Sequence, residues 1–237
     1  MILTARKTLS ISIIIPTRNE EKSIGSCLNR LAALSVLEII VVDGGSQDQT
    51  VTLARQQNVR VLVSAPGRGT QQHVGALRAK GDIFLFLHAD TRLPSDCCSQ
   101  LTTILQQPQV AAGAFRLAID SPETAFRIIE WGANLRSTLL QRPYGDQALF
   151  VNRQTYFAAG GFPEQPIMED VVLVERLKKR GNIVIANSSV ITSARRWQHR
   201  GLLATTLRNQ LMIAGKMAVI APDRLARWYY GVQKVRS

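Results

Sequence analysis

An imidazole and a carboxylate follow an apolar run at residues 83–87. The stretch IFLFLHAD places His88 and Asp90 directly after five apolar residues. A carboxylate is a usual ligand for a hard divalent cation, and an ion that bridges a diphosphate needs few donors from the protein. If an extended strand continued through both residues, the two side chains would share one face. The alternative is structural, with His88 a buried imidazole whose hydrogen bonds are made and Asp90 the cap of a helix beginning near Pro94.

Asp43 ends another apolar run, EIIVVD at residues 38–43, and is followed by two glycines. Its carboxylate could accept a hydrogen bond from a nucleotide base, because the glycines allow a close approach. It could also cap the turn or helix that follows, as Asp residues at strand ends often do. The residue alone leaves both interpretations open.

Two further motifs carry charge at the start of expected helices. Glu169 and Asp170 stand at the start of a helix expected at about 169–180, where acids favour a helix N-terminus electrostatically or one of them acts as a general base. Arg68, between two glycines, opens another expected helix, which suits phosphate binding through its guanidinium and exposed amides. The chain has neither G-x-x-x-x-G-K-[ST] nor G-x-G-x-x-G after its first expected strand.

The elements that would position these residues alternate along the first ninety residues. Apolar, β-branched runs predict strands at 11–15, 38–43, 59–63 and 82–87, and helical spacing predicts helices at about 20–33, 48–57 and 70–80. Strands that are apolar throughout predict a parallel, doubly wound sheet covered on both faces. Ligands bind such sheets beyond the carboxyl ends of the strands. Farther along, the sequence predicts strands at 111–119 and 147–152 and helices at about 123–140 and 202–220.

Composition predicts one α/β domain with a C-terminal extension. The chain has 237 residues and a net charge of +12, but residues 1–175 hold 16 Lys or Arg and 16 Asp or Glu. Residues 176–237 hold 13 Lys or Arg and a single acid, which suits nucleic acid, anionic lipid or a phosphorylated ligand. Three cysteines without metal-site spacing predict a reducing compartment. Because no 18 uninterrupted apolar residues occur, we expect no spanning helix and a cytoplasmic protein, with the inner face of the membrane as a further option.

Taken in chain order, four motifs resemble the family 2 glycosyltransferases of the GT-A fold. They read ISIIIPTRNEE, EIIVVDGGSQDQT, GRGTQQHVGALRAKGDIFLFLHADT and GGFPEQPIMEDVVLVERLKKRG, within residues 11 to about 181. The resemblance implies a GT-A domain at 1–195, with a Rossmann-like, doubly wound, mainly parallel sheet, and a basic, partly helical extension at 196–237. It also implies transfer of a sugar from a UDP- or GDP-sugar to a hydroxyl acceptor, assisted by Mn²⁺ or Mg²⁺, with inversion at the anomeric carbon.

The resemblance also implies roles for individual residues. Asp170 matches the catalytic base, with Glu169 beside it. Asp90 matches the metal-binding acid of the family's D-x-D-like motif, whereas His88 replaces the first Asp, which predicts a weaker metal site. His199 is a further candidate metal ligand near the diphosphate. The nucleotide-sugar pocket would be lined by Pro16, Thr17, Arg18, Glu20, Asp43, Arg68, His88 and Asp90.

Three further segments of the sequence allow more than one interpretation. Arg196 and Trp197 are similar to the Arg-Trp of the processive Q-x-x-R-W motif, but Ser193 stands in place of its Gln, so we expect a non-processive enzyme. Residues 144–147 either face the donor or form a turn. The helix at 202–220 packs on the domain or lies on a membrane with residues 228–230 at the headgroup level, where a lipid-linked acceptor would fit.

Two rival functions come from other classes. A basic nucleic-acid-binding module would fit the charge, but aromatic residues make up 6% of the chain and no nucleic-acid motif is present, so we expect no nucleic-acid partner. A nucleotidyltransferase would carry a glycine-rich, lysine-bearing loop after the first strand, where this chain has PTRNEE.

Overall fold

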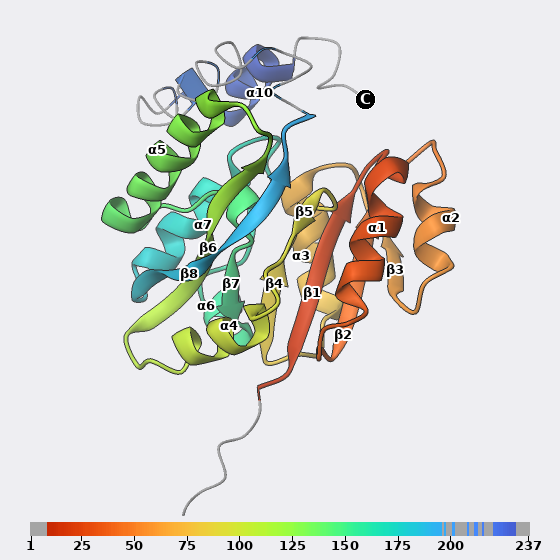
Figure 1. The fold of residues 1–237 in the computed structure, drawn as a ribbon, viewed down its shortest axis with the longest axis horizontal. Helices are drawn as coiled ribbons and strands as arrows, with labels where there is room; N and C mark the ends of the chain where they lie inside the picture. The colour runs from red at the N-terminus through yellow and green to blue at the C-terminus, as the bar shows by residue number, and fades with distance from the viewer. Residues whose placement is uncertain are drawn as a thin grey trace, which may run out of the picture.

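A single twisted sheet forms the centre of the molecule (Figure 1). The computed structural model describes residues 9–195, 197, 201, 208, 211–212, 215 and 220–230. The described sheet has eight strands in the order β3-β2-β1-β4-β7-β6-β8-β5. The strands are β1 (Ile11–Thr17), β2 (Glu38–Asp43), β3 (Arg60–Val63), β4 (Ile83–Phe86), β5 (Thr91–Arg92), β6 (Val110–Asp120), β7 (Phe150–Asn152) and β8 (Asn182–Ser193). The helices are α1 (Glu21–Leu31), α2 (Thr50–Arg55), α3 (Arg68–Arg78), α4 (Cys97–Leu105), α5 (Thr124–Leu140), α6 (Arg153–Ala158), α7 (Glu169–Lys178) and α10 (Pro222–Tyr230), with a 3-10 turn η1 (Gly145–Gln147).

The first half of the sheet is parallel, as the continuous apolar runs predict. β1 pairs with β2 on one side and with β4 on the other, and β2 pairs with β3, all in parallel. Thr17 at the end of β1 lies opposite Asp43 at the end of β2. The carboxyl ends of these strands therefore meet at one edge, where a doubly wound sheet binds its ligands.

The second half differs from the prediction. β7 runs antiparallel to both β4 and β6, and it begins at Phe150 because η1 and the left-handed Ala148 (φ 47°) precede it. β8, which pairs along nearly all of β6 in parallel, was not predicted from the sequence. Its sequence, NIVIANSSVITS, carries Asn-Ser-Ser in the middle, and this composition is typical of a turn. In the fold, the pairing with β6 outweighs that local preference.

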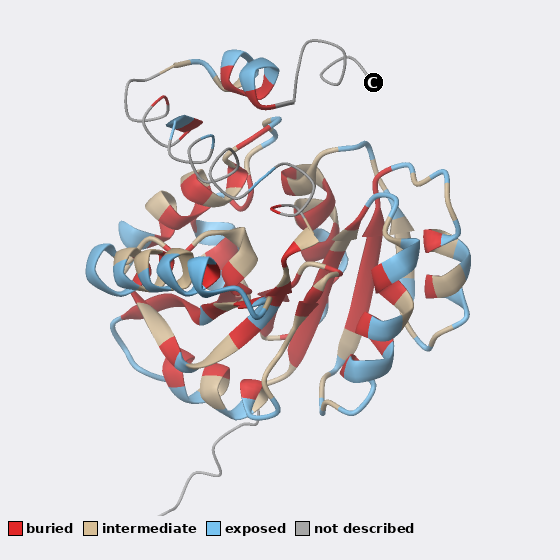
Figure 2. Ribbon diagram, turned by 45° about the horizontal axis from the view of Figure 1, so that its top comes forward, coloured by how far each residue is buried: buried red, intermediate tan, exposed pale blue. Residues whose placement is uncertain are grey.

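Helices cover both faces of the sheet, as Figure 2 shows by the buried strands between them. Along β1, Ile13 and Ile15 pack on one face in a cluster with residues of α1 and α4, while Ile14 packs on the other with residues of α3, α6 and α7. This alternation follows from the period of two along a strand. At Gly75 in α3, an added Cβ would lie 2.5 Å from Cγ2 of Ile14, so glycine lets α3 lie close against β1.

The C-terminal residues that the structure describes pack beside α7. Leu225, Ala226 and Tyr229 of α10 form a cluster with Met212 and with Ile167, which precedes α7. Trp228 remains 53% exposed. Most of the predicted helix at 202–220, and most of the 196–237 extension, lie outside the described residues. Within the described part of the chain, no helix is long and apolar enough to cross a bilayer.

Candidate functional site

Asp43 holds the turn that closes the β2 end of the site. The carboxylate is 2% exposed and accepts hydrogen bonds from the amides of Gly45 and Ser46, both at 2.9 Å, and from the Ser46 hydroxyl. Thr17 Oγ1 donates to it at 3.4 Å. The turn-capping interpretation is therefore confirmed, and the contact with a base stays a prediction.

A glutamine that the sequence analysis did not single out ties the ends of β1 and β2 together. Gln71 Nε2 donates to the carbonyls of Thr17 and Val42, both at 2.8 Å, from inside the core. A Cβ at Gly44 would lie 2.8 Å from the carboxamide carbon of Gln71, so the glycine after Asp43 leaves room for this side chain. The sequence feature that could have indicated Gln71 is its place on the inner face of an amphipathic helix, because a buried polar side chain there needs hydrogen-bond partners.

The end of β1 and the loop after it carry the predicted donor-pocket residues of the first motif. Thr17 is buried, Pro16 and Glu20 are half-buried, and Arg18 is exposed. Asn19 adopts a left-handed conformation (φ 56°), and its Oδ1 accepts a hydrogen bond from the amide of Gln47. The loops after β1 and β2 are thereby joined at the edge where Asp43 lies.

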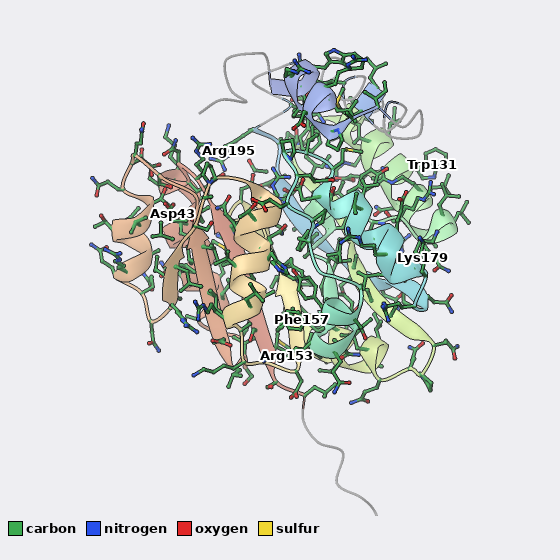
Figure 3. All side chains as sticks on the ribbon, turned by 180° about the vertical axis from the view of Figure 1, so that it is seen from behind. Asp43, Trp131, Arg153, Phe157, Lys179 and Arg195 are labelled. Carbon is green, nitrogen blue, oxygen red and sulfur yellow. The ribbon has the colours of Figure 1, made fainter. Side chains whose placement is uncertain are left out.

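Arg195, just after β8, connects two of the predicted site acids. Its Nη2 lies 3.2 Å from Glu20 Oε2, 3.6 Å from Asp90 Oδ2 and 2.7 Å from Ser23 Oγ. Its Nε bonds to the hydroxyl of Ser193, which turns the guanidinium toward the acids. In Figure 3, Asp43 and Arg195 lie at the same end of the sheet. No sequence motif paired this residue with the two acids, because they lie more than a hundred positions away.

The pKa of Glu20 reflects its burial and the nearby charges of Asp90 and Arg195. Burial raises the pKa of its carboxyl above the ordinary value, and the charge of Asp90 raises it further, while Arg195 lowers it. Desolvation penalises the charged form, and a second carboxylate nearby repels it. The guanidinium of Arg195 is therefore the cation that this pair of acids shares.

His88 and Asp90 do not share a strand face. β4 ends at Phe86, and the Thr91 amide donates to the His88 carbonyl at 3.1 Å, which bends the chain between the two residues. A Cβ added at Gly145 would lie 3.5 Å from His88 Nε2 and 3.2 Å from Asp170 Oδ2. His88 therefore borders Asp170 across Gly145, whereas Asp90 faces Arg195. The helix-cap alternative for Asp90 is wrong, since α4 begins at Cys97.

Asp170 occupies the first turn of α7 with both carboxylate oxygens held by backbone amides. Oδ2 accepts from the Gly145 amide at 2.7 Å, and Oδ1 accepts from the Val171 amide at 2.8 Å. Each oxygen keeps a second lone pair for another donor. Gly145 and Tyr144 also line a cavity beside Asp170 of about 10 Å³, room for about one water-sized group.

Glu169 points away from Asp170 and into the protein. Only 5% of the residue is exposed, and its Oε1 lies 3.8 Å from Nη1 of Arg68. At Gly69, an added Cβ would lie 2.8 Å from the carbonyl oxygen of Pro163 and 2.9 Å from Cβ of Glu169. Glycine at this position therefore allows the N-termini of α3 and α7 to approach each other, which brings Arg68 to the site.

The described donors fit a divalent cation only in part. Within the described ranges, no group of three His, Cys, Asp or Glu side chains could hold a metal ion. Asp90 is a carboxylate whose side chain is 28% exposed, and it follows the end of β4. One or two carboxylates with substrate phosphates are a usual way to hold Mg²⁺. The residues therefore fit a cation that a diphosphate completes. His199 lies outside the described residues.

Comparison with known proteins agrees with this geometry. The family model described as glycosyl transferase family 2 matches residues 12–162. The beta-monoglucosyldiacylglycerol synthase of Synechocystis sp. is 27% identical over 220 residues, which are 80% of this chain and 46% of that protein. The 4,4'-diaponeurosporenoate glycosyltransferase of Staphylococcus haemolyticus is 36% identical over 98 residues, 38% of this chain and 26% of that protein. The chain thus spans between about a quarter and a half of the length of these curated relatives.

Solved structures show the same fold. The crystal structure of S. aureus TarS superposes with a TM-score of 0.62 at 19% identity and covers 78% of this chain and 61% of that chain. Glucosyl-3-phosphoglycerate synthase from Mycobacterium tuberculosis, solved with Mn²⁺, UDP and glucosyl-3-phosphoglycerate, superposes with a TM-score of 0.56 at 20% identity, covering 78% and 70%. The family match extends over more than half of the chain and includes β1, β2 and the residues that follow β4. The chain belongs to glycosyl transferase family 2, with the GT-A fold.

Proposed function

We propose that this protein transfers a sugar from a nucleotide-diphosphate donor to a hydroxyl group of an acceptor, with inversion at the anomeric carbon. The observation that carries the proposal is the placement of Asp170. Its carboxylate lies at the N-terminus of α7, beside a cavity for a water-sized group. A general base must reach the hydroxyl from which it takes a proton, and this carboxylate is fixed in one orientation with lone pairs left over.

The donor would lie along the carboxyl ends of β1, β2 and β4. Asp43, at the end of β2, is the proposed contact for the base, and Arg68 at the N-terminus of α3 is the proposed contact for the phosphates. A UDP-sugar is the donor we favour, because TarS has been solved with UDP-GlcNAc and with UDP. Two relatives have lipids in their names, the beta-monoglucosyldiacylglycerol synthase and an undecaprenyl-phosphate 4-deoxy-4-formamido-L-arabinose transferase of Pseudomonas aeruginosa. We therefore propose a lipid-linked acceptor.

In the proposed reaction, the acceptor hydroxyl gives its proton to Asp170 as its oxygen forms a bond to the anomeric carbon. The bond between that carbon and the phosphate oxygen breaks, and the nucleoside diphosphate leaves with the electron pair. Asp90 is the residue we assign to a divalent cation, Mn²⁺ or Mg²⁺, which when bound neutralises charge on the leaving diphosphate. His88 contributes an imidazole beside Asp170, and Arg195 holds Asp90 from the opposite side.

Binding and transfer can be tested separately. UDP-sugar with Mn²⁺ should raise the melting temperature, and Asp90→Ala should remove the part of the shift that depends on Mn²⁺. Asp120→Ala is the matched control, because Asp120 also pairs with an arginine (2.9 Å, Arg92) but lies outside the site. An equal shift in Asp90→Ala and the wild type would exclude Asp90 from the site.

The choice between the two acids of α7 needs a turnover assay. Asp170→Asn should bind the donor with an unchanged thermal shift and lose most of the transfer, by about 10²-fold or more. Glu169→Gln should retain measurable transfer, because Glu169 is buried against Arg68 and does not face the cavity. Transfer that survives Asp170→Asn would assign the base to another residue.

A further inference from the structure

Four of the exposed large apolar side chains of helix α5 share one side of the helix. Ile128, Trp131, Leu135 and Leu139 are 70%, 66%, 41% and 69% exposed. At 100° per residue they fall within one side of the helix, opposite the buried Phe126, Ala133 and Ser137. We call these four residues the apolar stripe. A contiguous exposed stripe of this kind marks a surface that meets another apolar phase.

The inner side of α5 is held against β6 by apolar packing and by polar contacts, since Phe126 and Ala133 share a buried cluster with Leu117 and Ile119. Asn134 bonds to both the amide and the carbonyl of Leu117, at 2.8 and 3.0 Å, and Glu130 accepts the amide of Ile119 at 2.5 Å. β7 pairs with β6 at Ala112 and Gly113, and among the residues that the structure describes no strand pairs with the later part of β6 on that side. Side chains of α5 bond to the backbone of this part of β6, and together with the buried Phe126 and Ala133 they fix which side of the helix faces in.

Cations border one end of the apolar stripe. Lys178 Nζ donates to the carbonyl of Leu140 at 2.6 Å, which places the end of α7 against the end of α5. Lys179 and Arg180 follow and are exposed, and Arg142 lies 3.9 Å from Glu175 with its side chain 39% exposed. We call Arg142, Lys178, Lys179 and Arg180 the basic cluster. Trp131 and Lys179 project from the same flank of the molecule in Figure 3.

We propose that the apolar stripe and the basic cluster dock this protein on the surface of an anionic lipid bilayer. The pattern is that of a helix lying in the interface, with Trp and Leu in the acyl boundary and Lys or Arg at the headgroups. Charge complementarity favours this occupant, because Glu175 is the single acid in segments 136–142 and 175–180, against six Lys or Arg. At 17 residues, α5 is short for a span and suited to lying on the surface.

Docking through α5 would also orient the candidate site. Arg136 of α5 places its guanidinium carbon 3.8 Å from the ring centroid of Tyr144, and Tyr144 lines the cavity beside Asp170. The docked flank and the proposed base are therefore neighbours. That this orientation serves a lipid-linked acceptor rests on the proposed function, whereas docking itself does not.

The test is flotation of the full chain with vesicles of phosphatidylcholine alone or with about one-third phosphatidylglycerol. The wild type should float with the anionic vesicles. Leu135→Asn/Leu139→Asn should lower partitioning by about tenfold or more, because each buried CH₂ adds to interfacial binding. The matched control is Leu37→Asn/Leu77→Asn, which changes two exposed leucines (54% and 56%) outside α5 and should float like the wild type.

The charge part has its own variant and control. Lys178→Gln/Lys179→Gln/Arg180→Gln should lower binding to anionic vesicles by about tenfold or more, since each cation near the surface attracts anionic lipid. Lys22→Gln/Arg30→Gln/Arg55→Gln removes the same charge from exposed positions of α1 and α2 and should bind almost as the wild type does.

Fluorescence separates α5 from the C-terminal helix. Trp228→Phe leaves Trp131 and the buried Trp197, so a blue shift on adding anionic vesicles reports Trp131.

Three results would overturn the proposal. The first is that the wild type does not float with the vesicles. The second is that the stripe variant floats as well as the wild type. The third is that the wild type forms a dimer in sedimentation velocity, the stripe variant is a monomer, and neither binds vesicles. The thermal shift with UDP-sugar tests the proposed donor binding separately from docking, because the stripe variants should show the same shift as the wild type. Loss of donor binding with intact flotation would contradict the proposed function alone.

Discussion

Replacing Arg195 by Gln removes the guanidinium that lies between Glu20 and Asp90. We expect the free protein to bind Mn²⁺ more tightly after this change, because a fixed cation and a divalent ion compete for the same carboxylate. The relevant contact is 3.6 Å long, between side chains that are 41% and 28% exposed. Two unit charges at this distance interact by about 1 kcal/mol in a water-like dielectric, and exposed pairs contribute about 0.2 to 1 kcal/mol.

Loss of this competition should lower the apparent Kd for Mn²⁺ by about fivefold at most from the Asp90 contact alone. The repulsion between Glu20 and Asp90 that Arg195 now relieves adds to the effect in the same direction. The assay is titration of Mn²⁺ followed by the electron paramagnetic resonance signal of the free ion, without nucleotide. It reads binding and does not depend on turnover.

Two further variants make the result specific. Arg92→Gln removes an arginine that pairs with an exposed Asp120 at 2.9 Å, and it should leave Mn²⁺ binding unchanged. Arg195→Gln combined with Asp90→Asn should lose the gain, since the carboxylate that the ion would use is gone. If Arg195→Gln bound Mn²⁺ no more tightly than Arg92→Gln, the idea that Arg195 competes with a cation at Asp90 would be wrong.

Three other perturbations have a defined sign. Gly113→Ala should lower the free energy of unfolding in urea by roughly 1–3 kcal/mol, because its Cβ would lie 2.3 Å from two ring carbons of the buried Phe150. Gly132→Ala, with open space around it, should not destabilise the protein. Equal free energies of unfolding for the two variants would contradict the packing around Gly113. Since burial raises the pKa of Glu20, the stability it contributes is fully present below its unfolded pKa and is lost as the pH rises through the folded pKa. The melting temperature of Glu20→Gln minus that of the wild type should therefore be more positive at pH 7 than at pH 4, and the reverse order would refute this sign. A hydrogen bond from Cys97 lowers the pKa of the Cys98 thiol to about 7. Iodoacetamide at neutral pH should therefore modify Cys98 first, and Cys97→Ala should slow that reaction. An unchanged rate in Cys97→Ala would show that the hydrogen bond does not lower the pKa of Cys98.

Local sequence predicted the half of the fold in which each strand is apolar throughout. β1, β2, β3 and β4 were placed within one or two residues. β1, β2 and β4 are buried parallel strands, which need apolar side chains on both faces, whereas β3 is a partly exposed edge strand. β8 was missed because its central Asn-Ser-Ser has a turn-like composition, and its identity as a strand comes from pairing with β6. A residue's local preference is weak beside a ladder of backbone hydrogen bonds.

For the site, the sequence by itself determined which acids follow the strands, since Asp43 and Asp90 stand directly after apolar runs and Asp170 opens a helix. Tertiary structure decided what each acid faces. Arg195 reaches Asp90 across more than a hundred residues, and Gly145 brings His88 beside Asp170. Helix α5 carries apolar residues on two sides. The side with Phe126, Ala133 and Asn134 packs on β6, and the apolar stripe is left facing outward. Periodicity tells which residues share a face, whereas only the neighbouring backbone determines which face is buried.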